Sequence, residues 1–514
     1  MRWWCVVSAL AAAGCGPVAP PATVFYASGA DLQSINPLLT THPLARQVQR
    51  YALFLTLARY DTALVPQPYL AAGWRWSADR RALSLDLRPG VRWHDGAPTT
   101  AADVAFTLNA ARDPATGYPR RADLDCVTDV RAADSLTVRV SFCRPKADFP
   151  DVLTDLAILP AHLLGGIPHD ALRRAAFNQR PVGNGPFRFV SHQPDQRWVF
   201  AADPDFPAAL GGPPGIRRLV IEVVDEAATK LAGLVTGELD VAGIQPMHAA
   251  LVRRDPRLAV VDYPVLLTYG LVWNTARAPF DDARLRRALT MALDRRAMVE
   301  AYLYGFGVVA DGPVPPWHPR AVAVAAVRFD RAAASALLDS LGWRSGPDGV
   351  RRRDGRPLAF TILTVGAADN ALEQMIQSDL RAVGVAARIR QLELGAFLAR
   401  AAGPARDYDA LVTGIPGDLA LGYLRGLFDS RRRAEPLQYA QYANPAVDRA
   451  LDAGDFGEVQ RTVARDLPIT FLYHARGLAG MSRRLGGVRM DLRGELATLP
   501  RWHLIPRGAG AGGR

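Results

Sequence analysis

The sequence predicts a globular protein of at least two lobes, in which strands and helices follow one another along the chain. Its 514 residues exceed the roughly 250 to 300 at which a single hydrophobic core stops growing. Hydrophobic residues make up 49% and charged residues 22%, as in ordinary globular proteins. After the N-terminus, no run of about 18 consecutive apolar residues offers a transmembrane helix. The chain after the N-terminus is therefore long enough, and of suitable composition, to form more than one packed lobe.

Residues 1–15 are typical of an export signal, because a charged start at Met1-Arg2 is followed by an apolar run from Trp3 to Ala13. The last four residues, Ala-Ala-Gly-Cys, resemble the lipobox of bacterial lipoproteins. This predicts a lipid anchor on Cys15 and a Pro- and Ala-rich tether over residues 16–23. The alternative is an ordinary cleaved signal in which Cys15 has no role. We expect the protein in the cell envelope, outside the cytoplasm.

Strand and helix signals follow this segment in order. Apolar residues recur at helical spacing, and short runs alternate between apolar and polar residues as in half-buried strands. Asp103 suits the first turn of a helix, and Thr99 or Thr100 is placed to cap it. The expected elements are a strand over residues 23–27, a helix over 47–57, a strand over 83–88 and a helix over 101–112.

Two cysteines of the body flank a stretch that predicts a β-hairpin. Residues 127–131 and 136–140 alternate as strands around a four-residue turn, so Cys126 and Cys143 fall at the mouth of the hairpin. In an exported protein this placement favours a disulfide between them. The alternative is two buried free thiols. Neither cysteine has a partner at zinc-binding spacing, and we expect no metal.

The net charge of +11 and the pI near 9.8 raise the possibility of a nucleic-acid partner. Almost all of this charge is arginine, since Lys146 and Lys230 are the two lysines of the chain. The arginines are scattered, and the densest run, Arg351 to Arg353, lies in a turn rather than on a helix that could enter a groove. We therefore expect no nucleic acid. A weak attraction to anionic lipid head groups is the alternative use of the charge.

Enzymatic chemistry is not predicted. The nine histidines form no HExxH pattern, and the chain has no GxSxG or Walker motif. His162 and His169 are seven residues apart with prolines nearby, which favours surface or turn positions. His94 precedes Asp95 in a turn, and we interpret this pair as structural rather than catalytic. We expect no catalytic residue and no cofactor.

A long, ordered set of motifs resembles the extracellular solute-binding proteins of the dipeptide and oligopeptide ABC importers, family 5. The match covers nearly the whole mature chain and is more specific than any short motif. The residues that carry it are LAAGW at 70–74, LRPGVRWHDGAPTTAADVAFTL at 87–108, RPVGNGPF at 180–187, VWNT at 272–275, PFDD at 279–282, LRRAL at 285–289, GPVPP at 312–316, YANPAVD at 442–448 and LPITFLY at 467–473.

This resemblance implies an α/β, two-lobed fold like that of periplasmic binding proteins, with three domains, the second inserted into a discontinuous first. It also implies a monomer that captures a peptide-like or other small polar solute between closing lobes and passes it to an ABC permease and ATPase. The implied divisions are residues 1–15 for the lipoprotein signal, 16–23 for the tether, 24–50, 180–262 and 467–510 for lobe I, 51–179 for inserted domain II and 263–466 for lobe III.

The resemblance also implies which residues line the ligand cleft. They come from the loop after the first strand, from the strand before residue 274 and from a loop near residue 414. For Trp273 the alternative is core packing. The implied ligand-binding residues are Ala27, Ser28, Gly29, Tyr269, Trp273, Asn274, Gly414, Ile415 and Asp418.

One departure from the family bears on the ligand. Peptide receptors of this family hold the substrate ammonium with an Asp after a Gly, and here Ile415 or Pro416 stands in that place after Gly414. Asp418 comes two or three residues later and serves only if the loop is reshaped. The loop at 364–367 also lacks the Arg that some dipeptide binders use. An ammonium buried without a partner is costly, so we expect free peptide N-termini to be excluded unless Asp418 substitutes.

A second departure from the family concerns length, because the segment over residues 451–466 is shorter than the helix pair usual in the family. This shortening leaves open how the protein docks to a transporter. The alternatives to a peptide receptor are a receptor for a nickel chelate, haem or another non-peptide solute, and a surface sensor or scaffold that keeps the fold without transport.

Overall fold

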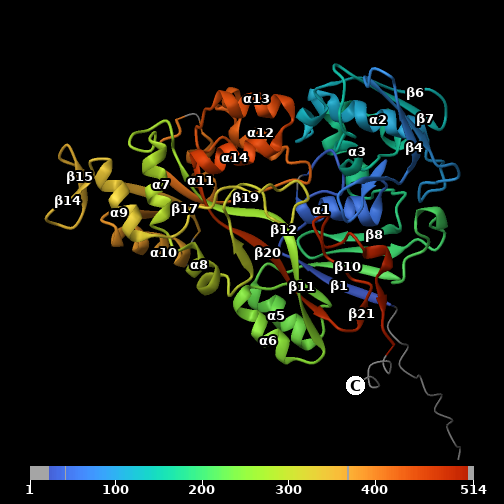
Figure 1. The fold of residues 1–514 in the computed structure, drawn as a ribbon. Coiled ribbons are helices and arrows are strands. Elements are labelled where there is room, and N and C mark those ends of the chain that lie inside the picture. Colours follow the sequence, from blue (N-terminus) through green and yellow to red (C-terminus); the bar gives the residue numbers. More distant parts are fainter. Residues whose placement is uncertain (1–21, 41, 367–369, 404, 507–514) are drawn as a thin grey trace, which may run out of the picture.

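The computed structural model describes residues 22–40, 42–366, 370–403 and 405–506. The signal at 1–15, Cys15 and most of the tether lie outside the described residues. The described part is built around a sheet of eleven strands, which runs through the molecule in the order β18-β17-β19-β12-β20-β11-β1-β10-β9-β8, with β13 added on β20 (Figure 1). In the described ranges, no helix has both the length and the apolar character that a membrane span requires.

One half of this sheet, which we call lobe I, begins at the start of the described chain. Parallel pairing of β1 with both β10 and β11 sets its register, and β9 and β8 extend it antiparallel. Its elements are β1 (Thr23–Ser28), α1 (Pro43–Val48), β8 (Phe187–Gln193), β9 (Arg197–Ala202), β10 (Arg218–Val223), α5 (Ala227–Thr236), β11 (Val241–Gly243) and α6 (Ala249–Arg254), with β21 (Leu485–Gly486) and β22 (His503–Leu504) beside it.

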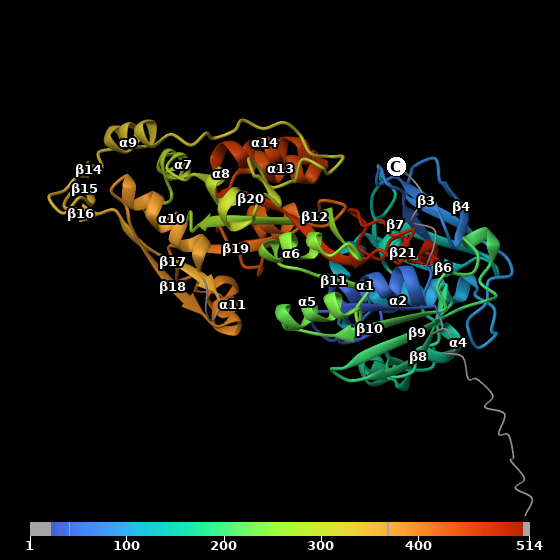
Figure 2. The same cartoon turned by 90° about the horizontal axis from the view of Figure 1, so that it is seen from below.

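The other half of the sheet, which we call lobe III, carries helices on both faces (Figure 2). Its strands are β13 (Gly307–Val309), β17 (Ala359–Val365), β18 (Ala386–Leu392) and β19 (Ala410–Pro416), with the small sheet of β14 (Arg344–Ser345), β15 (Arg351–Arg353) and β16 (Arg356–Pro357) at one end. Its helices are α7 (Ala283–Met291), α8 (Arg295–Ala297), α9 (Arg331–Ser340), α10 (Ala371–Ala382), α11 (Leu394–Ala402), α12 (Tyr423–Phe428), α13 (Pro445–Ala453) and α14 (Phe456–Asp466).

Two long strands, β12 (Leu258–Trp273) and β20 (Ile469–Ser482), join the two halves. They pair with each other antiparallel, while β20 also pairs with β11 of lobe I and β12 pairs with β19 of lobe III. Their register is interrupted between Pro264 and Thr268, where proline cannot donate to the ladder. The expected boundary between residues 262 and 263 falls inside β12, and the division of the chain into domains stays a prediction.

Domain II is a separate four-stranded sheet, in the order β4-β5-β7-β6, that lies above lobe I in Figure 1. Its elements are β4 (Ala71–Trp76), β5 (Ala82–Leu87), α2 (Ala101–Arg112), β6 (Val127–Ala132), β7 (Thr137–Phe142), α3 (Val152–Asp155) and α4 (Ala161–Leu164), with the pair β2 (Ala58–Tyr60) and β3 (Pro66–Pro68) next to it. The predicted helix over 101–112 is confirmed. Thr100 is its N-cap, and its backbone N–H donates to the Asp103 carboxylate over 2.7 Å.

The buried clusters divide the molecule into two lobes. Lobe I and domain II share one continuous core, which includes Phe54, Trp93 and Trp198. Lobe III has its own cores on the two faces of its sheet, around Trp273 and around Phe428. The predicted α/β, two-lobed fold is therefore confirmed, since hydrophobic burial closes separately on either side of the long strands.

The predicted helix over residues 47–57 is wrong in its extent. Helix α1 starts earlier, at Pro43, because proline favours the first helical turn, and the Nδ1 atom of His42 accepts a hydrogen bond from the Ala45 N–H. One wide turn follows over Gln49–Leu53, and Phe54 is already extended. Residues 54–57 are thus buried as irregular chain rather than as a helix face.

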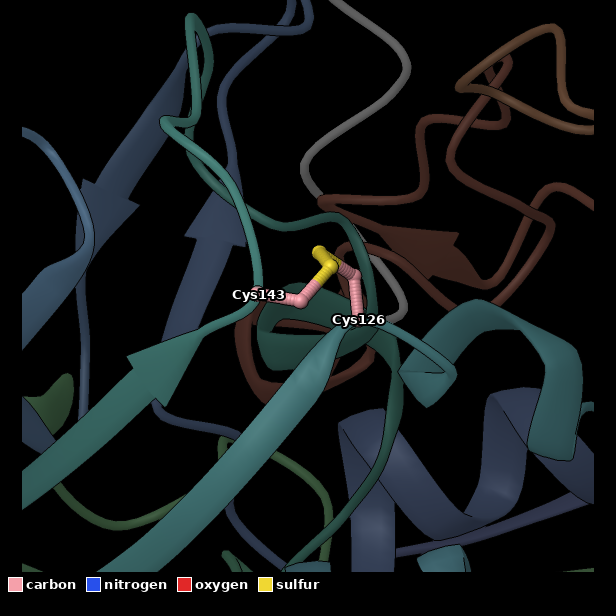
Figure 3. The surroundings of a disulfide bond; sticks show 2 residues. All are labelled: Cys126 and Cys143. Carbon is pink, nitrogen blue, oxygen red and sulfur yellow. A yellow bond between two sulfur atoms is a disulfide. The ribbon is translucent and has the colours of Figure 1, made fainter.

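The hairpin of β6 and β7 carries the disulfide. The two strands pair antiparallel, and Cys126 and Cys143 lie where they meet, with their Cα atoms 5.1 Å apart and their sulfur atoms bonded (Figure 3). The backbone N–H of Cys143 also donates to the carbonyl of Cys126. The bond closes the open end of the hairpin, so that β6, an edge strand of the domain II sheet, is held at both ends.

Candidate functional site

The loop after β1 lies at the end of the parallel strands of lobe I. Ser28 is buried, and its hydroxyl donates to the carbonyl of Ala30 over 2.6 Å, while Gly29 is exposed. A Cβ atom on Gly29 would lie 3.2 Å from the Nζ atom of Lys230. Ala27 is buried among the side chains under α5. Within this loop, Gly29 and the backbone beside it are the accessible part of the predicted site.

Tyr269 is the predicted aromatic residue that keeps an accessible face. It lies on β12 between Gly414 of β19 and Tyr473 of β20, and its ring stacks on Tyr473 at 4.9 Å. A Cβ atom on Gly414 would lie 3.2 Å from the Tyr269 ring, so glycine permits this close approach. Burial, and then the charge of Glu373, raises the pKa of Tyr269. The hydroxyl is therefore neutral at neutral pH and able to donate a hydrogen bond.

Three of the predicted ligand-binding residues lie in the core instead. Trp273 is 0% exposed, and its indole N–H donates to the Thr470 hydroxyl over 3.0 Å. Asn274 is also buried, and its amide donates to the carbonyls of Arg406 and Tyr408. Ile415 packs inside lobe III. Trp273 lies on the same face of β12 as Tyr269 but deeper in the lobe III core, whereas Ile415 points to the face opposite its neighbour Gly414. These three residues offer no surface to a ligand.

Asp418 holds its own loop. Its carboxylate accepts hydrogen bonds from the backbone N–H groups of Ala420, Gly422 and Tyr423 at 3.0, 2.9 and 2.7 Å. These bonds hold the loop over residues 417–422, which leads into α12. A ligand ammonium would therefore compete with three amides that the chain itself supplies.

Across from this loop lie charged residues of domain II, and we call the meeting place the seam: Asp418 on one side, and Arg120, Asp123 and Asp151 on the other. Burial, and then the charge of Asp418, raises the pKa of Asp151 to about 6. Burial also raises the pKa of Asp123, with Arg120 opposing and Asp418 adding to the effect. The Tyr60 hydroxyl donates to Asp151. At the seam Asp418 therefore meets the like charges of Asp123 and Asp151 and the opposite charge of Arg120.

Asp155 stands behind the seam at the centre of an arginine cluster. Its carboxylate pairs with the guanidinium groups of Arg46, Arg50 and Arg120. Burial by itself would raise the pKa of Asp155, and the three guanidinium groups overcome that effect and hold it well below its ordinary range. A cavity of about 10 Å³ beside the cluster has room for no more than one water.

Sequence reasoning missed this cluster and the domain II side of the seam. The partners of Asp155 are 109, 105 and 35 residues away along the chain, so no local spacing groups them. The pair of arginines at 120–121 is the one local signal, and arginines are frequent throughout this chain.

Four histidines make contacts that are typical of structural roles. The Nε2 atom of His94 lies 2.9 Å from the carbonyl of Gly185, where domain II meets lobe I. Burial lowers the pKa of His474 to about 3, and its Nδ1 atom lies 2.9 Å from the Thr268 hydroxyl. His162 and His169 pair with Asp95 and Asp113. Among the described residues, no group of three or more His, Cys, Asp or Glu is arranged to hold a metal ion.

A search of family models matches residues 65–430 to the bacterial extracellular solute-binding proteins, family 5 Middle. Protein XP55 of Streptomyces lividans is 30% identical over 87% of this chain and 83% of its own length. The oligopeptide-binding protein AppA of Bacillus subtilis is 25% identical over 91% of this chain and 89% of its own length.

Solved structures show the same fold. AppA of Bacillus subtilis, in complex with a nonapeptide, superposes with a TM-score of 0.77 at 24% identity, covering 94% of this chain and 99% of that one. NikZ of Campylobacter jejuni, in complex with Ni(L-His), reaches a TM-score of 0.80 at 22% identity, covering 94% and 100%. The family match spans well over half of the chain, and this protein therefore belongs to the bacterial extracellular solute-binding proteins, family 5.

Proposed function

We propose that this protein is the receptor of an ABC importer, which captures a small polar solute between lobe III and the joined lobe I and domain II and delivers it to a permease. The observation that carries the proposal is the architecture of the seam. Two lobes with separate cores are joined by β12 and β20, and the loop of Asp418 lies close enough to Arg120 and Asp151 of domain II for their charges to interact. Receptors of this family bind ligands and work with a permease and an ATPase.

In this proposal the ligand lies against Tyr269, Gly414 and the loop around Gly29. Tyr269 supplies an aromatic wall and a hydroxyl donor, and the glycines leave backbone groups within reach of a ligand. Lobe closure excludes water and strengthens the polar contacts. Asp418 binds the ligand only if its carboxylate gives up the hydrogen bonds from the backbone amides and accepts a ligand cation instead.

The ligand class follows from the state of Asp418. Several relatives are peptide receptors by name, including the dipeptide-binding protein of Escherichia coli, which is 28% identical over 74% of this chain. The engagement of Asp418 by three backbone amides favours a second candidate, a receptor for a non-peptide solute such as a metal chelate. The structure of NikZ with Ni(L-His) gives an example of that ligand class on the same fold.

A thermal-shift screen tests the proposal with di- to pentapeptides, amino-acid conjugates, sugars and nickel chelates. A ligand present at 100 times its Kd stabilises the folded state by about 2.7 kcal/mol, so a hit raises the melting temperature. Tyr269→Ala should weaken binding of the hit, measured by calorimetry. Phe329→Ala is the matched control, because Phe329 is an exposed aromatic residue of lobe III, and it should leave affinity unchanged. Silence of the parent chain across all four classes would contradict the proposal.

Asp418→Asn separates the two ligand classes. If a peptide hit is lost in this variant but kept in Asp348→Asn, an exposed aspartate of lobe III paired with Arg352, the loop is reshaped around a peptide ammonium. A hit that survives both changes favours the non-peptide candidate.

We also propose that Cys15 carries a lipid anchor, on the strength of the lipobox-like segment. Cells expressing the parent chain should incorporate labelled palmitate into the protein and retain it in the membrane fraction. Cys15→Ser should abolish both. Equal labelling of parent and variant would contradict the anchor.

A further inference from the structure

One end of lobe I, which we call the basic end, gathers exposed arginines from separate segments. There β1 and β12 begin, β20 ends, and α5 and α6 end, all at the lower side of Figure 1. Hydrogen bonds connect the segments, since Arg257 donates to the carbonyl of Val235 and Arg483 to that of Leu258. The exposed arginines of this end are Arg217, Arg218, Arg254, Arg257, Arg483 and Arg484.

The charge of this end is only partly balanced. Arg484 forms a bidentate pair with the buried Asp240, and Arg257 pairs with Asp255 over 2.7 Å. Glu222, which pairs with Arg197 over 3.7 Å, and Glu238 are the further acidic residues on the wall of the cavity there. Within the part of the chain that the structure describes, no carboxylate pairs with the other four arginines. The basic end is therefore a positively charged surface that attracts anions.

A cavity of about 1100 Å³ opens at the same end, away from the seam. Its apolar wall includes Phe25, Leu234 and Leu258, and Arg257, Arg483 and Arg484 also line it. Two apolar residues nearby remain exposed, Val235 at 37% and Ile505 at 41%. An apolar hollow beside cationic side chains suits an amphipathic anion, whereas an acidic protein or a nucleic acid would leave the apolar wall unused.

We propose that the basic end docks on a membrane surface that contains anionic phospholipids, with the arginines on the phosphate groups and apolar lipid parts against the cavity wall. The position of Thr23 supports this orientation, because the first residue of β1 lines the same cavity and the tether precedes it. Strand β1 then runs six residues to Ser28, about 20 Å at strand rise. The loop of Gly29 therefore lies at the far end of β1 from the basic end.

Vesicle sedimentation tests the inference independently of ligand binding and of the anchor. The full chain with Cys15→Ser cannot be lipidated at that residue, and phosphatidylcholine vesicles with and without phosphatidylglycerol separate charge attraction from insertion of the apolar N-terminal run. The test variant adds Arg254→Gln, Arg257→Gln and Arg483→Gln. Arg484 is kept, because its loss would leave Asp240 buried without a partner.

The matched control removes the same charge from lobe III, through Arg356→Gln, Arg388→Gln and Arg390→Gln, which are all exposed. We expect the Cys15→Ser chain with all its arginines to bind phosphatidylglycerol vesicles, and to bind them less as salt is raised. The test variant should lose roughly 100-fold in partitioning, since each arginine near an anionic leaflet contributes about fivefold. The control should lose far less. Equal loss in the two variants, or no preference for phosphatidylglycerol, would overturn the inference and leave the basic end to a protein partner. Thermal melting of both variants verifies that they fold.

Discussion

The two sides of the seam use a carboxylate in opposite ways. Asp418 of lobe III is held by three backbone amides that lie within five residues of it. Asp155, behind the seam, is held by three arginines from distant parts of the chain. The first carboxylate organises a loop, whereas the second ties α1 of lobe I to domain II.

This difference decides what each residue can do for a ligand. A carboxylate that caps amides can turn to a ligand cation if the loop moves, because the amides then meet water at the surface. A carboxylate among three guanidinium groups cannot be withdrawn without leaving several positive charges close together in a poorly solvated place. Asp418 is therefore the adjustable group of the seam, and Asp155 is its fixed support.

The largest effect should come from removing the fixed support. Asp155→Asn leaves three guanidinium groups without their shared partner, and loss of one member of a buried ion pair costs about 3 to 5 kcal/mol. Chemical denaturation should show a loss of this size. Asp348→Asn, which breaks an exposed pair with Arg352, should cost less than about 1 kcal/mol. Equal losses would mean that the arginine cluster is a surface feature and that the comparison with Asp418 fails.

A smaller effect should appear as a pH dependence. The pKa of Asp151 is about 6 in the folded protein and 3.8 ordinarily, so between these values the folded state holds a proton that the unfolded state releases. This group therefore adds stability as pH falls from 7 toward 4, on the order of 2 kcal/mol. Asp151→Asn should remove that gain.

Two comparisons isolate the contribution of Asp151 to the pH dependence of stability: one with Asp151→Asn and one with Asp418→Asn. Histidines with lowered pKa, such as His474, destabilise the fold over the same pH range, so the difference between the parent and Asp151→Asn is the quantity to plot. Glu495, whose pKa burial raises to about 7, contributes equally to the parent and to the variant, so its contribution cancels in that difference. Asp418→Asn should shift the titration of Asp151 to lower pH, because it removes a negative charge across the seam. An unchanged titration would mean that the lobes do not approach in solution as they do here.

Much of the fold could be predicted because its signals are local. The helix over 101–112 has a cap and a favourable first turn within four residues, and the alternation of the hairpin strands fixed their pairing. The helix predicted over 47–57 failed because apolar spacing alone does not distinguish a helix face from buried irregular chain. Pro43, four residues earlier, carried the stronger signal for a helix start.

The site was harder to predict because it depends on contacts between distant segments. The resemblance to the family predicts that β12 and β19 border the ligand cleft, yet it could not tell which residues of each strand are buried. Trp273 and Asn274 proved to be core residues next to the accessible Tyr269. The arginines around Asp155 come from α1 and from the segment after α2, and only the folded chain brings them together.

The smallest effect should come from the adjustable side of the seam. Asp418→Ala removes the acceptor of three backbone N–H groups, and loss of such a cap typically costs about 1 kcal/mol. The loop over residues 417–422 is partly exposed, so water can replace part of what is lost. Hydrogen exchange should speed up at Gly422 and Tyr423 while the strands of lobe III stay protected. A loss as large as that of Asp155→Asn would mean that Asp418 also supports the fold, and that it cannot be the group that moves toward a ligand.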